Sequence, residues 1–150
     1  MDKKAHKIFH FALPMLMILS ILSACAEKPA TSATFENIGQ YKDGTKIALT
    51  GYLDLYNSFE STMGSDYSPV RLRDANDERD ITVWIEHKDY EKDTQPNRMK
   101  SLLLLYDESS LMVWLNNGTE AGFGSKVKIT GTLRFTDDGH PFIYRVTKIE

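Results

Sequence analysis

The stretch KVKITGTLRF, residues 126–135, alternates apolar and polar residues more strictly than any other part of this 150-residue chain. Because successive side chains of a β-strand point to opposite faces, this alternation predicts a strand with one buried face. Gly131 stands in the middle of that face, and a glycine inside a strand indicates a bend, a bulge or the close approach of another backbone. The residues expected to point inward are Val127, Ile129, Gly131, Leu133 and Phe135.

The same pattern occurs near the start of the chain, where KIALTGYLDLY, residues 46–56, has Gly51 at its middle. Two shorter runs, at residues 69–73 and 80–86, are predicted to form a hairpin, and residues 141–150 a last strand. At least five strands, two of them long and centred on glycine, favour a small closed barrel over a flat sheet. In the last strand, Tyr144, Val146 and Ile149 are expected to be available for packing. The inward residues predicted for the other strands are Ile47, Leu49, Leu53, Leu55, Val70, Leu72, Ile81, Val83 and Ile85.

The tract VKITGTLRF…GHPFIYRVTKIE, together with KIALTGYLDLY, resembles the OB-fold domains of exported bacterial proteins. The resemblance covers residues 45–150 and implies a mainly β, OB-fold-like barrel. It departs from the family at residues 89–123, where an OB-fold has one short helix and this chain is predicted to add a hairpin. The Asn117-Gly118 pair favours a primed turn in that hairpin. The four leucines at residues 102–105 fit a helical turn or a strand.

Residues 1–24 are expected to be a signal peptide. Three lysines precede an apolar run at residues 9–22, and small residues follow it, which is the order of charged, apolar and cleavage regions in such a peptide. The run is shorter than the roughly 20 residues that a membrane-spanning helix needs. A permanent span is therefore not expected.

The residues Leu22-Ser23-Ala24-Cys25 resemble the lipobox of bacterial lipoproteins. The resemblance implies cleavage before Cys25 and attachment there of diacylglycerol and an acyl chain such as palmitate, which would anchor the protein to a membrane. We expect a bacterial cell-envelope location, and the absence of aspartate at Ala26 favours the outer membrane, facing the periplasm, in a Gram-negative source. The alternative is an ordinary secretory signal with a chance cysteine. Residues 25–44 are expected to form a flexible tether, and residues 45–150 the barrel domain.

Charge and motifs disfavour several classes of function. The chain has 18 basic and 21 acidic residues, and loss of residues 1–24 takes three lysines and one aspartate, which leaves a net charge of −5. We therefore expect nucleic acid to be an unlikely partner. Cys25 is the single cysteine, which excludes disulfides in a lipidated chain. The histidines His87 and His140 stand far apart, and HExxH, GxSxG, Walker A and GxGxxG motifs are absent, so we expect no enzyme, no catalytic residue, no metal and no cofactor.

OB-folds usually bind ligands along the outer face of their second and third strands. Aromatic rings beside guanidinium groups suit stacking on a base or sugar ring and pairing with an anion. The alternative is a solvated face of cross-strand pairs, such as Arg73 opposite Glu86 or Thr82. The residues expected on this face are Tyr52, Arg71, Arg73 and Trp84, with Tyr56 beside them.

Two functional hypotheses follow. The first is a lipid-anchored, non-enzymatic envelope module that recognises a protein, a glycan or a small ligand. The alternative is an oligonucleotide-binding OB domain that uses the aromatic and arginine face. The sequence identifies neither the ligand nor the oligomeric state.

Overall fold

The computed structural model describes residues 29–56, 66–88, 95–100 and 107–150. The predicted signal peptide, Cys25 and the four leucines at residues 102–105 lie outside the described residues. Within the described ranges, no helix has the length and apolar character to cross a membrane.

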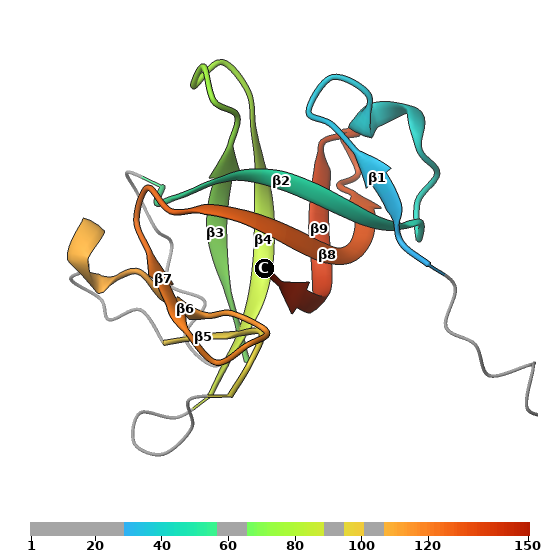
Figure 1. Cartoon of the computed structure of the whole chain (residues 1–150). Helices are drawn as coiled ribbons and strands as arrows, with labels where there is room; N and C mark the ends of the chain where they lie inside the picture. Colours follow the sequence, from blue (N-terminus) through green and yellow to red (C-terminus); the bar gives the residue numbers. More distant parts are fainter. Residues whose placement is uncertain (1–28, 57–65, 89–94, 101–106) are drawn as a thin grey trace, which may run out of the picture.

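Five strands close into a barrel. Antiparallel pairing joins β2 to β3, β3 to β4, β8 to β9 and β8 back to β2, while β4 and β9 pair in parallel and complete the ring. Figure 1 shows β2 and β8 crossing in front of β3 and β4. This order of strands is that of the OB-fold, so the predicted fold class is confirmed. The strands are β2 (Lys46–Asp54), β3 (Tyr67–Arg73), β4 (Asp80–Lys88), β8 (Lys126–Phe135) and β9 (Pro141–Ile149).

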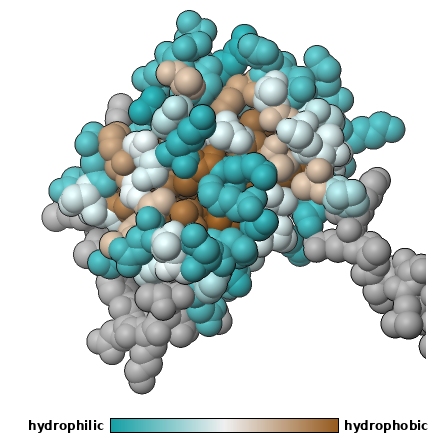
Figure 2. Space-filling view, in the orientation of Figure 1, coloured by the Kyte–Doolittle hydropathy of each residue, from teal (hydrophilic) through white to brown (hydrophobic). Residues whose placement is uncertain are grey.

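The barrel encloses one apolar core, and the predicted inward faces of β2, β3, β4 and β8 are confirmed. Their apolar inward residues are at most 2% exposed, apart from Leu55 and Phe135, which are half-buried at the margin of the core. In Figure 2 apolar residues show through the middle of the viewed face, framed by hydrophilic ones. The fully covered residues are Ile47, Leu49, Leu53, Val70, Leu72, Ile81, Val83, Ile85, Val127, Ile129 and Leu133.

The two central glycines allow strands to approach closely. A Cβ added at Gly51 would lie 2.7 Å from the carbonyl oxygen of Arg73, and one at Gly131 would lie 2.5 Å from Cγ2 of Ile143. Both distances are shorter than van der Waals contact permits. The expectation of close backbone approach is therefore confirmed at Gly51, and Gly131 serves the same purpose against β9.

Strand β9 departs from simple alternation. Thr130 pairs with Lys148 and Thr132 with Tyr144, so β9 uses more residues than β8 across this interval. The irregularity contains Arg145, whose φ of 51° lies in the left-handed region. As a result Ile143 points into the core at 0% exposure, and Tyr144, which was expected to be available for packing, lies on the outer face and packs against Tyr67 there. A bulge changes the phase of a strand in this way.

Three short strands within the described residues 95–100 and 107–125 extend the sheet from β4, in the region where an OB-fold usually has a helix. Strand β5 (Arg98–Lys100) pairs in parallel with the last residues of β4. Strand β6 (Met112–Trp114) pairs antiparallel with β5 and with β7 (Glu120–Gly122). Figure 1 shows β5, β6 and β7 gathered at one end of the barrel. The expected hairpin is β6–β7. Its turn is not primed, since within it positive φ occurs at Gly118 but not at Asn117, and a primed type I′ turn needs both.

The segment before β2 belongs to the domain, which corrects the predicted tether boundary. Strand β1 (Thr31–Ala33) pairs in parallel with β2, and a 3-10 turn (Ile38–Gln40) follows it. Ala33 and Ile38 are buried at 7% and 6% exposure. The segment therefore packs on the barrel through these two buried residues and the pairing with β2, although its sequence lacks any sustained periodicity. The ordered domain therefore begins by Thr31 and not at residue 45.

Candidate binding groove

A row of aromatic side chains lies on the outer face where β4 and β9 meet. The parallel register pairs Thr82 with Phe142 and Val83 with Ile143. Because Val83 and Ile143 point into the core at 0% exposure, the residues on either side of them point outward. Trp84 of β4 thus lies on the same face as Phe142 and Tyr144 of β9.

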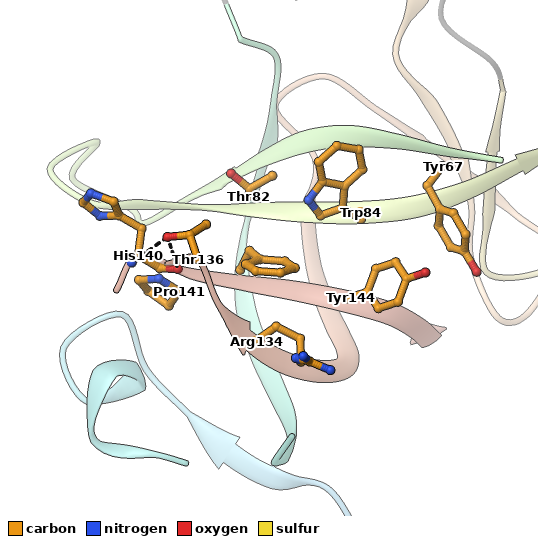
Figure 3. Close-up of a pocket in the computed structure, with 9 residues that line it drawn as sticks. Tyr67, Thr82, Trp84, Arg134, Thr136, His140, Pro141 and Tyr144 are labelled. Atoms are coloured by element: carbon orange, nitrogen blue, oxygen red, sulfur yellow. Dashed lines mark hydrogen bonds between the residues drawn. The ribbon is translucent and has the colours of Figure 1, made fainter. Parts of the chain in front are cut away.

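These residues line a groove of about 620 Å³, a volume within the usual range for small-molecule sites. Figure 3 shows the side chains that converge on it from β3, β4, β8 and β9. Aromatic and proline rings make up most of the described lining, and none of the described lining residues is acidic. The lining residues are Tyr67, Thr82, Trp84, Arg134, Thr136, His140, Pro141, Phe142 and Tyr144.

The turn between β8 and β9 forms one end of the groove. The backbone N–H of Thr136 donates to the carbonyl oxygen of His140 at 2.9 Å, and the N–H of His140 donates to Oγ1 of Thr136 at 3.0 Å. Gly139, with φ of 84°, allows the chain to reverse between them. These bonds, dashed in Figure 3, place the exposed imidazole of His140 beside Pro141.

Two tyrosines form the other end. The ring centroids of Tyr67 and Tyr144 are 5.1 Å apart and the rings are tilted by 45°, a favourable geometry for an aromatic pair. Burial, and next the neighbouring Tyr144, raise the pKa of Tyr67. Its hydroxyl therefore stays protonated at neutral pH. Glu86, which lies opposite Tyr67 in the register, forms an ion pair with Arg98.

Arg134 is the cation that lines the groove. Its Nε donates to Oδ1 of Asp43 at 3.0 Å, and both side chains are half-exposed. A guanidinium has five N–H donors, so this contact occupies only one edge. Deeper on the face, the hydroxyls of Tyr56 and Thr82 are 2.7 Å apart, and burial raises the pKa of Tyr56.

The predicted site residues divide between two places. Trp84 lies in the groove, whereas Tyr52, Arg71 and Arg73 lie together at another part of the outer face. There the guanidinium carbon of Arg73 is 5.6 Å from the ring centroid of Tyr52. The structure therefore brings three of the four residues together, but without the tryptophan.

Both arginines of this second cluster are held by carboxylates. Arg71 contacts Asp80 at 2.7 Å and Asp54 at 3.1 Å, and Arg73 contacts Asp54 at 3.3 Å. The hydrogen bond to Asp80 raises the pKa of Arg71. The alternative of cross-strand pairs describes this region better than an anion site does. The register differs from the one expected, since Arg73 lies opposite Asp80 and Arg71 opposite Thr82.

Sequence reasoning missed most of the groove. Phe142 and Tyr144 alternate along β9, and this pattern was a usable signal, but the bulge hid which of the two faces they occupy. Tyr67 precedes the predicted strand, and Arg134 is one of the residues that alternation in residues 126–135 places on the outward face, without indicating a site. Among the described residues, no group of three His, Cys, Asp or Glu side chains is placed to hold a metal ion.

No protein-family model matches this chain, and no curated protein matches it. Among the solved structures that match is the crystal structure of the telomere capping protein Ten1 from Saccharomyces pombe, at 16% sequence identity and a TM-score of 0.40. The match covers 80% of this chain and 81% of that chain.

This comparison contradicts two expectations from the sequence. That protein is named as a telomere capping protein, and the likeness stands against the expected lipid-anchored envelope module. It likewise contradicts the expectation that nucleic acid is an unlikely partner. The physical reason is that net charge averages over the whole surface, whereas the lining residues that the structure describes include no acidic one. The likeness is distant, so what this chain binds has to be argued from its own groove.

Proposed function

We propose that the domain binds single-stranded oligonucleotides through the groove between β4 and β9. The observation that supports this most directly is the outward row of Trp84, Phe142 and Tyr144, with Tyr67 at its end. Every nucleobase has a flat face that can stack on such rings, and one stacked base contributes about 1–3 kcal/mol. The groove therefore suits bases that are unpaired and accessible.

The proposed site differs from the arginine face expected from the sequence. Arg71 and Arg73 are neutralised by Asp54, Asp77 and Asp80, and a phosphate would have to displace those carboxylates. Arg134 and His140 line the groove itself and are half or more exposed. Stacking then supplies most of the affinity, with few phosphate contacts, and the proposal involves binding without any chemical step.

The test is a titration of a short, fluorescently labelled oligodeoxythymidylate with the purified protein at low salt, followed by the fluorescence anisotropy of the label. Trp84→Ala should weaken binding by about tenfold or more, because it removes a stacking surface. The matched control is Trp114→Phe, which removes the other tryptophan of the chain and leaves Trp84 in the groove. Equal affinity of the two variants, or no binding by the unmodified protein, would count against the proposal.

We infer separately, from the sequence alone, that Cys25 is a lipidation site. This proposal is supported only by the charged start, the apolar run and the sequence Leu22-Ser23-Ala24-Cys25. Since the ordered domain begins by Thr31, at most about 20 Å of extended chain would separate an anchored Cys25 from it. Mass spectrometry of the protein from its native membrane should find a mature chain that begins at an acylated Cys25. An unmodified thiol there would rule lipidation out.

A further inference from the structure

Arg145 differs from the other arginines of the chain. All six lie in described residues, and five of them have a carboxylate oxygen within 4.0 Å. The carboxylate partners are Asp54 and Asp80 for Arg71, Asp54 for Arg73, Glu36 for Arg79, Glu86 for Arg98 and Asp43 for Arg134. Arg145 has no such partner within the part of the chain that the structure describes.

The backbone of Arg145 is also unusual. Its φ of 51° is in the left-handed region, which is unfavourable for a residue with a long side chain. The residue lies in the irregular part of β9, where this strand has more residues than its partner β8. Bulges next to binding sites commonly serve to redirect a side chain. Here the bulge leaves Arg145 exposed on the surface.

The redirected side chain lies next to the groove. The guanidinium carbon of Arg145 is 5.8 Å from the ring centroid of Tyr144, and Tyr144 lines the groove and contacts Tyr67. A guanidinium on an aromatic ring is attracted to its face and still presents N–H donors at its edge. The tyrosine end of the groove thus combines a stacking ring with a cation that no described carboxylate neutralises.

We propose that Arg145 is the phosphate contact of the groove, so that the site selects a phosphodiester strand whose base stacks at the Tyr144 end. This inference rests on the proposed function and names the part of the ligand that the groove recognises besides the base. A guanidinium can bind two phosphate oxygens at once. Nucleosides and uncharged aromatic compounds would then bind only through stacking, and more weakly.

The test compares the salt dependence of oligodeoxythymidylate binding by the full-length protein and two charge variants. Arg145→Asn removes the cation and keeps a residue that tolerates left-handed φ. Loss of one phosphate contact should reduce the slope of log affinity against log salt by about 0.7. Lys148→Asn is the matched control, since it removes the same charge from the same strand, where Lys148 contacts Glu150 at 2.7 Å. It should leave the slope unchanged.

Two further measurements keep the outcomes distinct. Arg145→Lys keeps the positive charge and still places a long side chain at the left-handed φ of residue 145. It should therefore retain the salt slope, which shows whether a smaller slope in Arg145→Asn comes from the lost charge or from a change in folding. Thymidine, which has no phosphate, should bind Arg145→Asn and the unmodified protein equally. If Trp84→Ala abolishes oligonucleotide binding while Arg145→Asn keeps the full slope of log affinity against log salt, the groove binds oligonucleotides but Arg145 does not contact a phosphate. If the unmodified protein binds no oligonucleotide at all, the proposed function itself fails.

Discussion

At the scale of single residues, Gly131 shows most directly how one residue type permits the close approach of β8 and β9. A Cβ at this position would lie 2.5 Å from Cγ2 of Ile143 and 3.2 Å from the carbonyl oxygen of Tyr144. Ile143 is fully buried and cannot move away without disturbing the core. We therefore expect Gly131→Ala to lower the free energy of unfolding by about 1–3 kcal/mol, measured by urea denaturation.

The control for this substitution is Gly39→Ala. Nothing lies within 4 Å of a Cβ added at Gly39, and its φ is not in the left-handed region. The free energy of unfolding should therefore change by no more than about 0.5 kcal/mol. Equal stability of the two variants would contradict the close approach of β8 and β9 at Gly131.

At the scale of elements, the carboxylate of Asp54 joins β2 to β3. It is 9% exposed and contacts guanidinium nitrogens of Arg71 and Arg73 at 3.1 and 3.3 Å. Asp54→Asn would leave two partly buried cations side by side with a neutral amide between them. Because both arginines retain some solvent and contacts to other carboxylates, we expect a loss of about 1–2 kcal/mol in the free energy of unfolding.

An exposed ion pair provides the comparison. Glu36 and Arg79 are 3.6 Å apart with most of the glutamate side chain in solvent, so Glu36→Gln should cost no more than about 0.5 kcal/mol. Asp54→Asn should also leave oligonucleotide affinity unchanged, since the groove is elsewhere. An increase in affinity would mean that freeing Arg71 and Arg73 creates a binding site, and would restore the face expected from the sequence.

Strand β9 shows how far the sequence could predict these elements. The inward faces of β2, β3, β4 and β8 follow from alternation alone, because each of these strands keeps one phase along its inward residues. In β9 the bulge at Arg145 changes the phase, so Ile143, Val146 and Ile149 are all buried although their spacing is not that of a regular strand. A period of two therefore cannot identify Tyr144 as outward.

The groove was harder to predict than the strands that form it. Trp84 could be assigned to an outer face from its neighbours in β4, but its partners on β9 lie nearly 60 residues later in the chain. Their proximity depends on the parallel pairing of β4 and β9, which no local pattern records. The ion pairs of Arg71 and Arg73 could not be predicted without the register between β3 and β4. The sequence around an arginine on a strand does not show whether a carboxylate lies opposite it.

At the scale of the whole molecule, charge is distributed in local clusters. The chain has a net charge of −3, yet three aspartates surround Arg71 and Arg73 on one part of the surface, while no aspartate occurs among the groove residues within the described ranges. The long-range field of the protein disfavours a polyanion, whereas the groove itself does not. We infer that this protein associates with an oligonucleotide more slowly than a basic protein would. Short-range stacking then determines how long the complex lasts.

The N-terminal segment protects an edge of the closed barrel, because β1 pairs with β2 at Ile47–Leu49. A chain that starts at residue 45 would lose β1 and the buried residues Ala33 and Ile38, and would expose that edge. Compared with a chain that starts at residue 29, we expect it to be about 3 kcal/mol less stable in thermal or urea unfolding. The exposed edge should also favour association between chains, visible as an earlier peak in size-exclusion chromatography. Equal stability and equal size of the two proteins would mean that the segment is a tether after all.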